Sequence, residues 1–398
     1  MRTSGRREAV ELTPGTRQRR LAALSIGQVI SWGILYYALI VAAPVIAADT
    51  GWALATVMLA FSVGLVTSAL AGILVGRWLD RGSPRVVMTA GSLLGALGLA
   101  LVSAAPDVTV FVLGWIVTGM GQSAVLYQAA FTVIARREAA HRRRSMTVVT
   151  LAGGLASTAF APLTAAMLSV LDWRATMLVL AIGLVVSTTP LHWWSLERGW
   201  SPRPPRVADE PHHTVSTVLR TRRFWALQLS MIAIAAALYS VALAIIPLYT
   251  ERGMTYELAA WGLGLVGAGQ VLGRIVYVVL PHAASPRLPL LLTAGLSAIV
   301  LGLLALVPGP PWLLIVIGIA AGAVRGAQTL VQGSAVADRW GTREYGAING
   351  AFAAPITAVT AVGPALGPVV AVATGSYAAM GLIAAVLALV GLALARLS

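Results

Sequence analysis

Two arginines stand inside long apolar stretches of this sequence, where a charge is costly. Arg325 lies near the middle of GIAAGAVRGAQTLVQGSAVADRW (318–340), and Arg274 lies in GAGQVLGRIVYVVLP (267–281). A guanidinium in hydrocarbon costs about 3 kcal/mol on insertion scales, so its retention there calls for a reason. Its planar fork donates two parallel hydrogen bonds to a carboxylate. The chemistry that these residue types suggest is the recognition of an anion.

The acidic residues of the chain lie away from both arginines. All 14 Asp and Glu fall in the polar segments or at the ends of the apolar runs, and the chain has no Cys. Two cations without a carboxylate in a low-dielectric interior are poorly explained by structure alone. We therefore predict a small anionic substrate as their partner. No spacing of His, Cys, Asp or Glu indicates a metal site, and no motif indicates a cofactor.

Each arginine also has a structural alternative. Arg274 is about one and a half turns from the cytoplasmic end of its run, so its side chain could reach the membrane surface. Arg325 is 11 residues from the nearer end of its run. That distance is about 16 Å, which an Arg side chain cannot span. For Arg325 the alternative is hydrogen bonding to the backbone carbonyls of a broken helix.

Further polar and aromatic side chains recur at helical spacing in the apolar runs. Gln328 and Gln332 follow Arg325 on the same helical face, while glycines at 318, 322 and 326 form a smooth stripe for close packing. We take the following as candidate substrate contacts, with packing or an interhelical hydrogen bond as the alternative for each: Gln28, Trp32, Tyr36, Ser123, Tyr127, Tyr239, Gln270 and Asn349.

The elements that must position these residues are long apolar helices. The chain is 58% hydrophobic and 11% charged, and its apolar residues form continuous runs, each long enough for a helix that crosses a bilayer. We predict an all-α polytopic membrane protein with 12 transmembrane helices. The runs are 21–47, 52–76, 84–105, 108–134, 146–170, 174–194, 224–249, 256–280, 288–307, 311–336, 345–372 and 377–395.

Most of the basic residues lie in the polar segments between the apolar runs. All 28 are Arg, and 24 of them fall on one side of the membrane if the loops alternate. This asymmetry predicts that both termini are cytoplasmic. It excludes a nucleic-acid patch, because the charge is spread over every inner loop instead of one face. The Arg-rich, Lys-free composition is typical of a prokaryote with a GC-rich genome, so we expect a multi-pass protein of the plasma membrane, in contact with lipid and monomeric.

One long polar segment divides the runs into six and six. We predict a cytoplasmic tail at 1–20, a six-helix bundle at 21–194, a linker at 195–223 and a second six-helix bundle at 224–398. Ser83-Pro84-Arg85 recurs as Ser285-Pro286-Arg287, in the corresponding loop of the second half. Two parallel repeats of this kind place the substrate site near mid-membrane, at their interface.

The loop GRWLDRGSPR (76–85) resembles the inner-loop signature of the major facilitator superfamily. The matching residues are Gly76, Asp80, Arg81, Gly82 and Arg85. The resemblance implies a rocker-switch transporter with two pseudo-symmetric six-helix bundles. It also implies that this loop is a latch on the inner gate, contacting the helix that begins near Tyr345 and the basic pair Arg136-Arg137. Locally, Asp80 is placed to accept from the N-terminus of a neighbouring helix.

A narrower resemblance is to the monocarboxylate porter and oxalate/formate antiporter group. It is carried by the first two runs with their loop, by LDWRATMLVLAI (171–182) and by REYGAINGAFAAPITAVTAVGPALGP (343–368). Members of that group bind substrate through an Arg on helix 8, a position that Arg274 resembles. Proton-coupled animal members carry an Asp one turn earlier, where this chain has Gln270. The usual proton carrier is therefore missing, which favours anion antiport or symport with a protonated substrate.

These observations predict a secondary transporter, and not an enzyme, that moves a small organic anion, foremost a monocarboxylate. Two alternatives stay open. A drug or metabolite efflux pump of the same superfamily predicts a large aromatic pocket and neutral or cationic substrates. A receptor or scaffold derived from the fold predicts no flux. No Walker or hydrolase motif occurs in the chain.

Overall fold

The computed structural model describes residues 14–138, 141–199, 214–279 and 285–398, and every regular element in these ranges is a helix. Most of the predicted tail at 1–20 and the central part of the predicted linker lie outside the described residues. Within these ranges, twelve helices are long and apolar enough to cross a membrane, as the sequence predicts. They are Arg17–Thr50, Leu54–Arg81, Pro84–Ala104, Val108–Arg137, Arg142–Leu168, Trp173–Ser195, Arg222–Ala242, Trp261–Val279, Leu288–Leu306, Pro311–Trp340, Tyr345–Val362 and Tyr377–Ala395.

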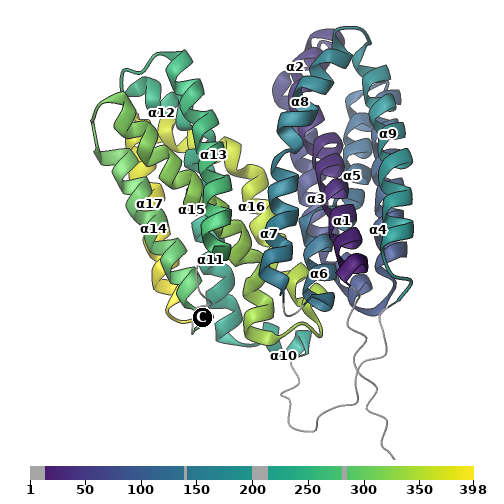
Figure 1. Ribbon diagram of the computed structural model, residues 1–398. Helices are drawn as coiled ribbons and strands as arrows, with labels where there is room; N and C mark the ends of the chain where they lie inside the picture. Colours follow the sequence, from purple (N-terminus) through teal and green to yellow (C-terminus); the bar gives the residue numbers. More distant parts are fainter. Residues whose placement is uncertain (1–13, 139–140, 200–213, 280–284) are drawn as a thin grey trace, which may run out of the picture.

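The helices form two bundles that stand side by side (Figure 1). The N-terminal bundle contains α1 (Pro14–Trp32), η1 (Gly33–Tyr37), α2 (Ala38–Thr50), α3 (Leu54–Arg81), α4 (Pro84–Ala104), α5 (Val108–Val125), α6 (Tyr127–Arg137), α7 (Arg142–Gly154), α8 (Ala156–Leu168) and α9 (Trp173–Ser195). The C-terminal bundle contains α11 (Arg222–Leu243), α12 (Ile245–Glu251), α13 (Tyr256–Val279), α14 (Leu288–Leu306), α15 (Pro311–Trp340), α16 (Tyr345–Thr374) and α17 (Tyr377–Ala395). The short helix α10 (Val215–Leu219) leads into the second bundle.

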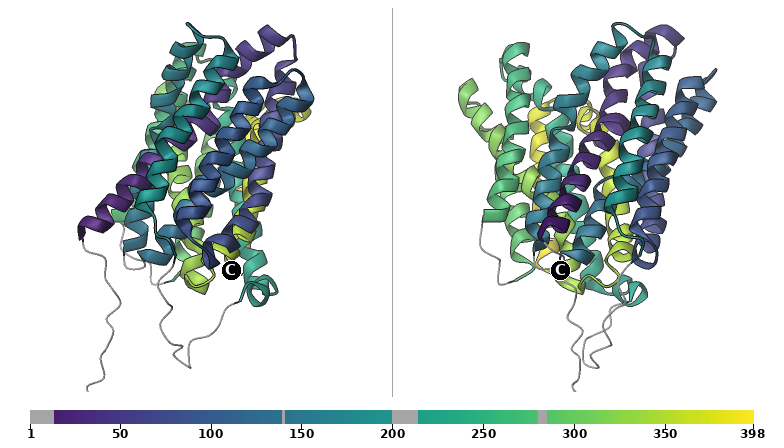
Figure 2. Two further views of the ribbon diagram at one scale, coloured as in Figure 1. Left: turned by 90° about the vertical axis from the view of Figure 1, so that its right-hand side faces the viewer. Right: turned by 45° about the vertical axis from the view of Figure 1, so that its right-hand side comes forward.

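Both α1 and α17 have their chain ends at the same end of the molecule, which we call the terminal end (Figure 2). Toward the opposite end the two bundles diverge (Figure 1).

Polar residues between the spans cap the helices. Asp107 and Asp172 accept the Val110 and Ala175 N–H groups at 3.0 and 2.7 Å, which satisfies free donors at the N-termini of α5 and α9. Glu251 lies at the same end as these two residues, opposite the terminal end, and accepts from Ser376 Oγ at 2.5 Å and from Tyr377 N at 2.6 Å, where α17 begins. The acids that the sequence places between apolar runs thus stabilise helix ends.

Close backbone contacts set the position of α15. A Cβ atom added at Gly322 or Gly326 would come within 2.1 Å of a carbonyl oxygen of α13, that of Val266 or Gln270. The glycine stripe that the sequence places on this helix therefore packs against α13. Because Arg325 lies beside this stripe, its helix is fixed at backbone distance from the helix that carries Arg274.

Three of the described spans are interrupted within their length, and a fourth break follows the span that begins at Arg222. A π-helical turn, η1, interrupts the first span, and non-helical or distorted residues separate α5 from α6 at Leu126, α7 from α8 at Leu155 and α11 from α12 at Ala244. Interruptions at membrane depth occur where protein or a cavity can satisfy the backbone, and in transporters they cluster at the substrate site.

Candidate functional site

Arg274 connects the two bundles. Its side chain is 7% exposed, and its Nη1 donates to the Thr150 carbonyl oxygen of α7 at 3.0 Å. Its Nε is buried and has no hydrogen-bond partner in the described part of the chain. The guanidinium thus points into the interface between the bundles and not along α13 toward the membrane surface, so the snorkelling alternative does not describe this conformation.

A tyrosine of the N-terminal bundle donates to the same carbonyl oxygen as Arg274. The Tyr127 hydroxyl donates to the Thr150 carbonyl at 3.3 Å. Two glycines make room for this convergence, since a Cβ at Gly153 would lie 2.4 Å from the Tyr127 hydroxyl and one at Gly154 would lie 2.9 Å from Arg274 Nη1. The adjacent break at Leu155 ends α7 directly after this pair.

Aromatic rings extend from Tyr127 along the N-terminal bundle. Trp32 packs against Tyr127 and Tyr36, with ring centroids 4.9 and 5.2 Å apart. The Tyr36 and Tyr37 rings, consecutive residues of the π-helical turn, are 5.1 Å apart. The Trp32 indole N–H is buried and lacks a hydrogen-bond partner among the described residues.

Arg325 faces this aromatic surface from the C-terminal bundle. Its guanidinium carbon lies 4.0 Å from the centroid of the Tyr239 ring, in a cation–π contact. Tyr37 is close enough to interact electrostatically with Tyr239 and with both intramembrane arginines. We call Arg274, Arg325, Tyr36, Tyr37, Tyr127 and Tyr239 the arginine–tyrosine cluster. Among the described residues, neither of its arginines forms an ion pair.

The glutamines that the sequence singles out occupy different surroundings. Gln28 is fully buried and donates to the Val125 carbonyl at 2.6 Å, a contact within the N-terminal bundle. Gln328 and Gln332 pair with each other along α15, at 3.4 Å. Gln270 is partly buried, and its side chain has no hydrogen bond to another described residue. Of these, Gln270 is the glutamine whose side chain is left to meet a substrate.

Ser123 and Asn349 lie together at the seam between the bundles. Both line a small void of about 10 Å³ among α3, α5, α6 and α16, and both are at most 3% exposed. The Ser123 hydroxyl donates to the Met120 carbonyl of its own helix at 2.6 Å. These two residues therefore line the packed seam.

The last two turns of α3 contact the C-terminal bundle at the terminal end, so Gly76, Asp80 and Arg81 of the predicted loop belong to a helix. Asp80, which is 5% exposed, accepts from the Gly346 and Ala347 N–H groups at 3.0 and 2.6 Å, at the N-terminus of α16. Its Oδ1 is 3.7 Å from Arg136 Nη1. A Cβ at Gly76 would come within 2.0 Å of the Gly346 carbonyl, so glycine is required where α3 crosses α16. These are the contacts that the family resemblance implies for Asp80.

The other residues of the motif lie at the end of α3 and the start of α4. Arg81 and Gly82 are exposed, and Gly82 ends α3 with its N–H on the Trp78 carbonyl at 2.7 Å. Arg85 donates through Nε to the Leu196 carbonyl at 2.9 Å, within the N-terminal bundle. Arg137, which the resemblance groups with Arg136, pairs with Glu197.

Two further contacts cross the seam at the terminal end. Arg142 of α7 pairs with Asp338 of α15, and the Arg143 guanidinium lies 4.3 Å from the centroid of the Tyr277 ring of α13. Together with the Asp80 and Arg274 contacts, they tie the bundles together on the side where the chain ends lie. The polar contacts between the bundles thus gather at one end, while the ribbons diverge at the other (Figure 1).

Sequence reasoning missed Tyr37, Thr150 and the glycine pair at 153 and 154. Tyr37 is the second of two consecutive tyrosines, and it joins the cluster because the π-helical turn brings neighbouring rings together. Thr150 takes part through its backbone carbonyl, which no side-chain pattern reveals. The adjacent glycines were a usable signal, since a pair in an apolar run often marks a close approach.

The described chain thus forms two helical bundles that meet around an internal cluster. The Major Facilitator Superfamily model matches residues 24–308, which is more than half of the chain. The chain therefore belongs to the major facilitator superfamily and is a multi-pass membrane transporter. No curated protein sequence matches it significantly.

Solved structures share the fold at low sequence identity. The E. coli fucose:proton symporter FucP is 16% identical, with a TM-score of 0.68 over 95% of this chain and 98% of the other. A FucP structure in the outward conformation gives the same values. The human organic anion transporter MFSD10 (TETRAN) is 15% identical, with a TM-score of 0.66 over 96% of this chain and all of the other. These likenesses establish the twelve-helix fold; the substrate has to be argued from this chain's own residues.

Proposed function

We propose that the chain transports a small organic anion, foremost a monocarboxylate, and binds it at the arginine–tyrosine cluster. The observation that carries the proposal is that Arg274 contacts the other bundle and Arg325 lies against Tyr239, while neither has an acidic partner in the described residues. A carboxylate substrate would supply the missing charge, and the guanidinium fork suits it.

Unsatisfied donors support the same substrate. Arg274 Nε and Trp32 Nε1 are buried without a hydrogen-bond acceptor in the described residues. A buried donor left unpaired costs about 1–3 kcal/mol, and a ligand oxygen would remove that cost. The neighbouring rings of Tyr36 and Tyr127 would pack on the apolar part of the substrate. We therefore favour a monocarboxylate with a compact apolar body.

The positions of the acidic residues bear on whether transport is coupled to protons or to a second anion. None of the 14 carboxylates lies in the interior of an apolar run, and the turn before Arg274 carries Gln270. A dedicated intramembrane carboxylate for proton transfer is therefore missing from the sequence of the spans. We propose exchange of two anions, or entry of the substrate together with its own proton, as in the monocarboxylate and oxalate/formate group that the sequence resembles.

The direction in which the site opens follows from the loops. The terminal end carries the arginine-rich loops, which we propose to be cytoplasmic by the positive-inside rule. The contacts that join the bundles are at this end. We propose that the two bundles, 21–194 and 224–398, rock about the cluster and that this conformation is closed toward the cytoplasm.

Counterflow in proteoliposomes tests the proposal. We expect labelled lactate or benzoate to accumulate against unlabelled carboxylate, and Arg325→Gln and Arg274→Gln each to abolish the accumulation. Arg396→Gln is the matched control, because this arginine is exposed at the end of the chain and far from the cluster. Undiminished carboxylate counterflow in both cluster variants contradicts the assignment. Transport of neutral or cationic amphipathic compounds in place of carboxylates would favour an efflux pump, and no flux of any compound would favour a receptor.

A further inference from the structure

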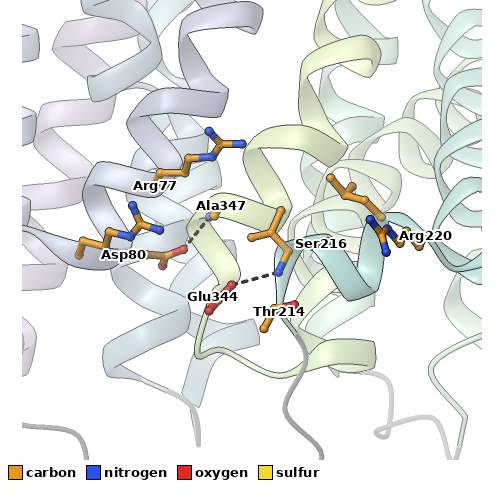
Figure 3. A pocket seen from close by; sticks show the side chains of 10 residues that line it. Arg77, Asp80, Thr214, Ser216, Arg220, Glu344 and Ala347 are labelled. Carbon is orange, nitrogen blue, oxygen red and sulfur yellow. Dashed lines mark hydrogen bonds between the residues drawn. The ribbon is translucent and has the colours of Figure 1, made fainter.

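A second basic site lies at the terminal end, away from the arginine–tyrosine cluster. A cavity of about 620 Å³ opens between α3, α10 and the start of α16 (Figure 3). Arg77 and Arg81 of α3 and Arg220, directly after α10, contribute to its wall. A volume of this size is within the range of small-molecule sites.

The acids of this cavity are already engaged. Asp80 accepts the Gly346 and Ala347 N–H groups at 3.0 and 2.6 Å, and Glu344 accepts the Val215 N–H at 3.0 Å (Figure 3). Both carboxylates thus serve to hold α16 and α10 in place. Asp80 Oδ1 is also 3.7 Å from Arg136 Nη1, and the three arginines of the cavity wall outnumber its two carboxylates.

The arginines of the cavity are free to meet another anion. In the described part of the chain, the side chains of Arg77, Arg81 and Arg220 form no hydrogen bond or ion pair, and all three residues are exposed. The exposed Ser216 hydroxyl lines the same wall and adds a donor. Three forked cations and a hydroxyl around one hollow are donors that suit a phosphate group, which offers several oxygens and more than one charge.

We propose that this cavity is a binding site for a phosphate-bearing anion. The phosphate would lie between Arg77 and Arg81 on one side and Arg220 on the other. The phosphate group belongs either to a soluble phosphate compound or to the headgroup of an anionic phospholipid. The arginines would recognise the phosphate in the same way in both cases. The site is distinct from the proposed transport site and does not depend on what that site carries.

Because the cavity lies between the two bundles, a bound anion would affect how they are held together. Arg77 and Arg81 belong to the N-terminal bundle, whereas Arg220 is joined through α10 and Glu344 to the C-terminal bundle. An anion that contacts both sides stabilises the state in which the Asp80 latch is closed. By linkage, the anion binds more weakly when the terminal end opens.

Binding to the purified full-length protein in detergent tests the proposal. The probes are inorganic phosphate and dihexanoyl phosphatidylglycerol, each titrated by calorimetry at low salt. We expect saturable binding of at least one probe, weakened tenfold or more in the double variant Arg77→Gln/Arg220→Gln. Arg222→Gln/Arg223→Gln is the matched control, since these exposed arginines change the net charge equally and do not line the cavity. We expect the control to bind within twofold of the unaltered protein.

The possible results distinguish a soluble ligand from a lipid headgroup, and both of these from a failure of the proposal. Binding of phosphate alone supports a soluble ligand, and binding of the phospholipid alone supports a headgroup site. Absence of saturable binding of both probes, or equal weakening in the two double variants, overturns the proposal.

A second measurement needs neither double variant. It uses a cysteine substituted for Thr132, a residue that is 2% exposed in the seam. We expect the bound probe to slow thiol modification at this cysteine at least threefold, and an unchanged rate at saturation contradicts the link to the latch.

Discussion

Asp80→Asn is the perturbation that bears most directly on the latch. The buried Asp80 carboxylate accepts two backbone N–H groups of α16, at 3.0 and 2.6 Å, and lies 3.7 Å from Arg136 Nη1. An asparagine of the same shape keeps one acceptor oxygen and turns an NH₂ group toward the second N–H. One backbone donor is then left unpaired in the closed state, and the charge that attracts the helix N-terminus is lost.

The magnitude follows from these contacts. A hydrogen bond to a charged group contributes about 1.5–3 kcal/mol, and a buried donor without an acceptor costs about 1–3 kcal/mol. In the open state water satisfies the same groups, so the loss falls on the closed state. A net change of about 2–3 kcal/mol shifts the equilibrium toward the open terminal end about 30- to 150-fold.

The assay uses the absence of cysteine from the chain. A single cysteine at Thr132 is buried in the closed seam, beside Gly346, so its modification by a maleimide reports opening. We expect Asp80→Asn to raise the modification rate at least tenfold. Glu251→Gln is the control, because the same chemical change then falls on a carboxylate at the opposite end. Equal modification rates with and without the Asp80→Asn substitution would refute the latch.

Three further outcomes are expected. Tyr239→Leu removes the cation–π contact to Arg325 and weakens substrate binding about 2- to 30-fold in a titration, whereas Tyr239→Phe keeps the ring and stays within twofold. Gly154→Ala places a Cβ 2.9 Å from the neighbouring guanidinium of α13 and speeds maleimide labelling of the seam, but Gly183→Ala, in open space, does not. Burial of the Glu251 carboxylate tends to raise its pKa, yet the hydrogen bonds that it accepts at α17 outweigh burial and hold the pKa below its ordinary value. Glu251 thus contributes stability above a pH of about 4.3 that is lost as pH falls through the lowered pKa, so the Glu251→Gln melting temperature is lower than that of the unaltered protein at pH 7 and converges with it in acid.

The fold was accessible from the sequence because the bilayer limits the solutions. Twelve apolar runs with arginine-rich alternate loops admit few arrangements other than a helical bundle, and the same twelve spans occur in the structure. The contacts of Asp80 were accessible because a local motif carries them. The glycine stripe beside Arg325 likewise predicted a close helix contact, found with α13.

The interior of the site was less accessible, for physical reasons. A helical pattern assumes a regular period, and the π-helical turn at 33–37 breaks it, which brings Tyr37 beside Tyr36. The partner of Arg274 is a backbone carbonyl on a helix of the other bundle, at Thr150. Gln28 resembles a site residue by spacing but forms a contact within one bundle, because spacing fixes a face and not the neighbour of that face.

The central claim is that the arginine–tyrosine cluster recognises a negative charge. The most direct measurement compares the affinity of the purified transporter for a carboxylate, lactate, with that for its neutral isostere, lactamide. We expect the unaltered protein to prefer lactate at least 100-fold, and Arg274→Gln/Arg325→Gln to bind the two compounds equally while it still melts cooperatively. A preference for lactate that survives the loss of both guanidinium groups would contradict the account.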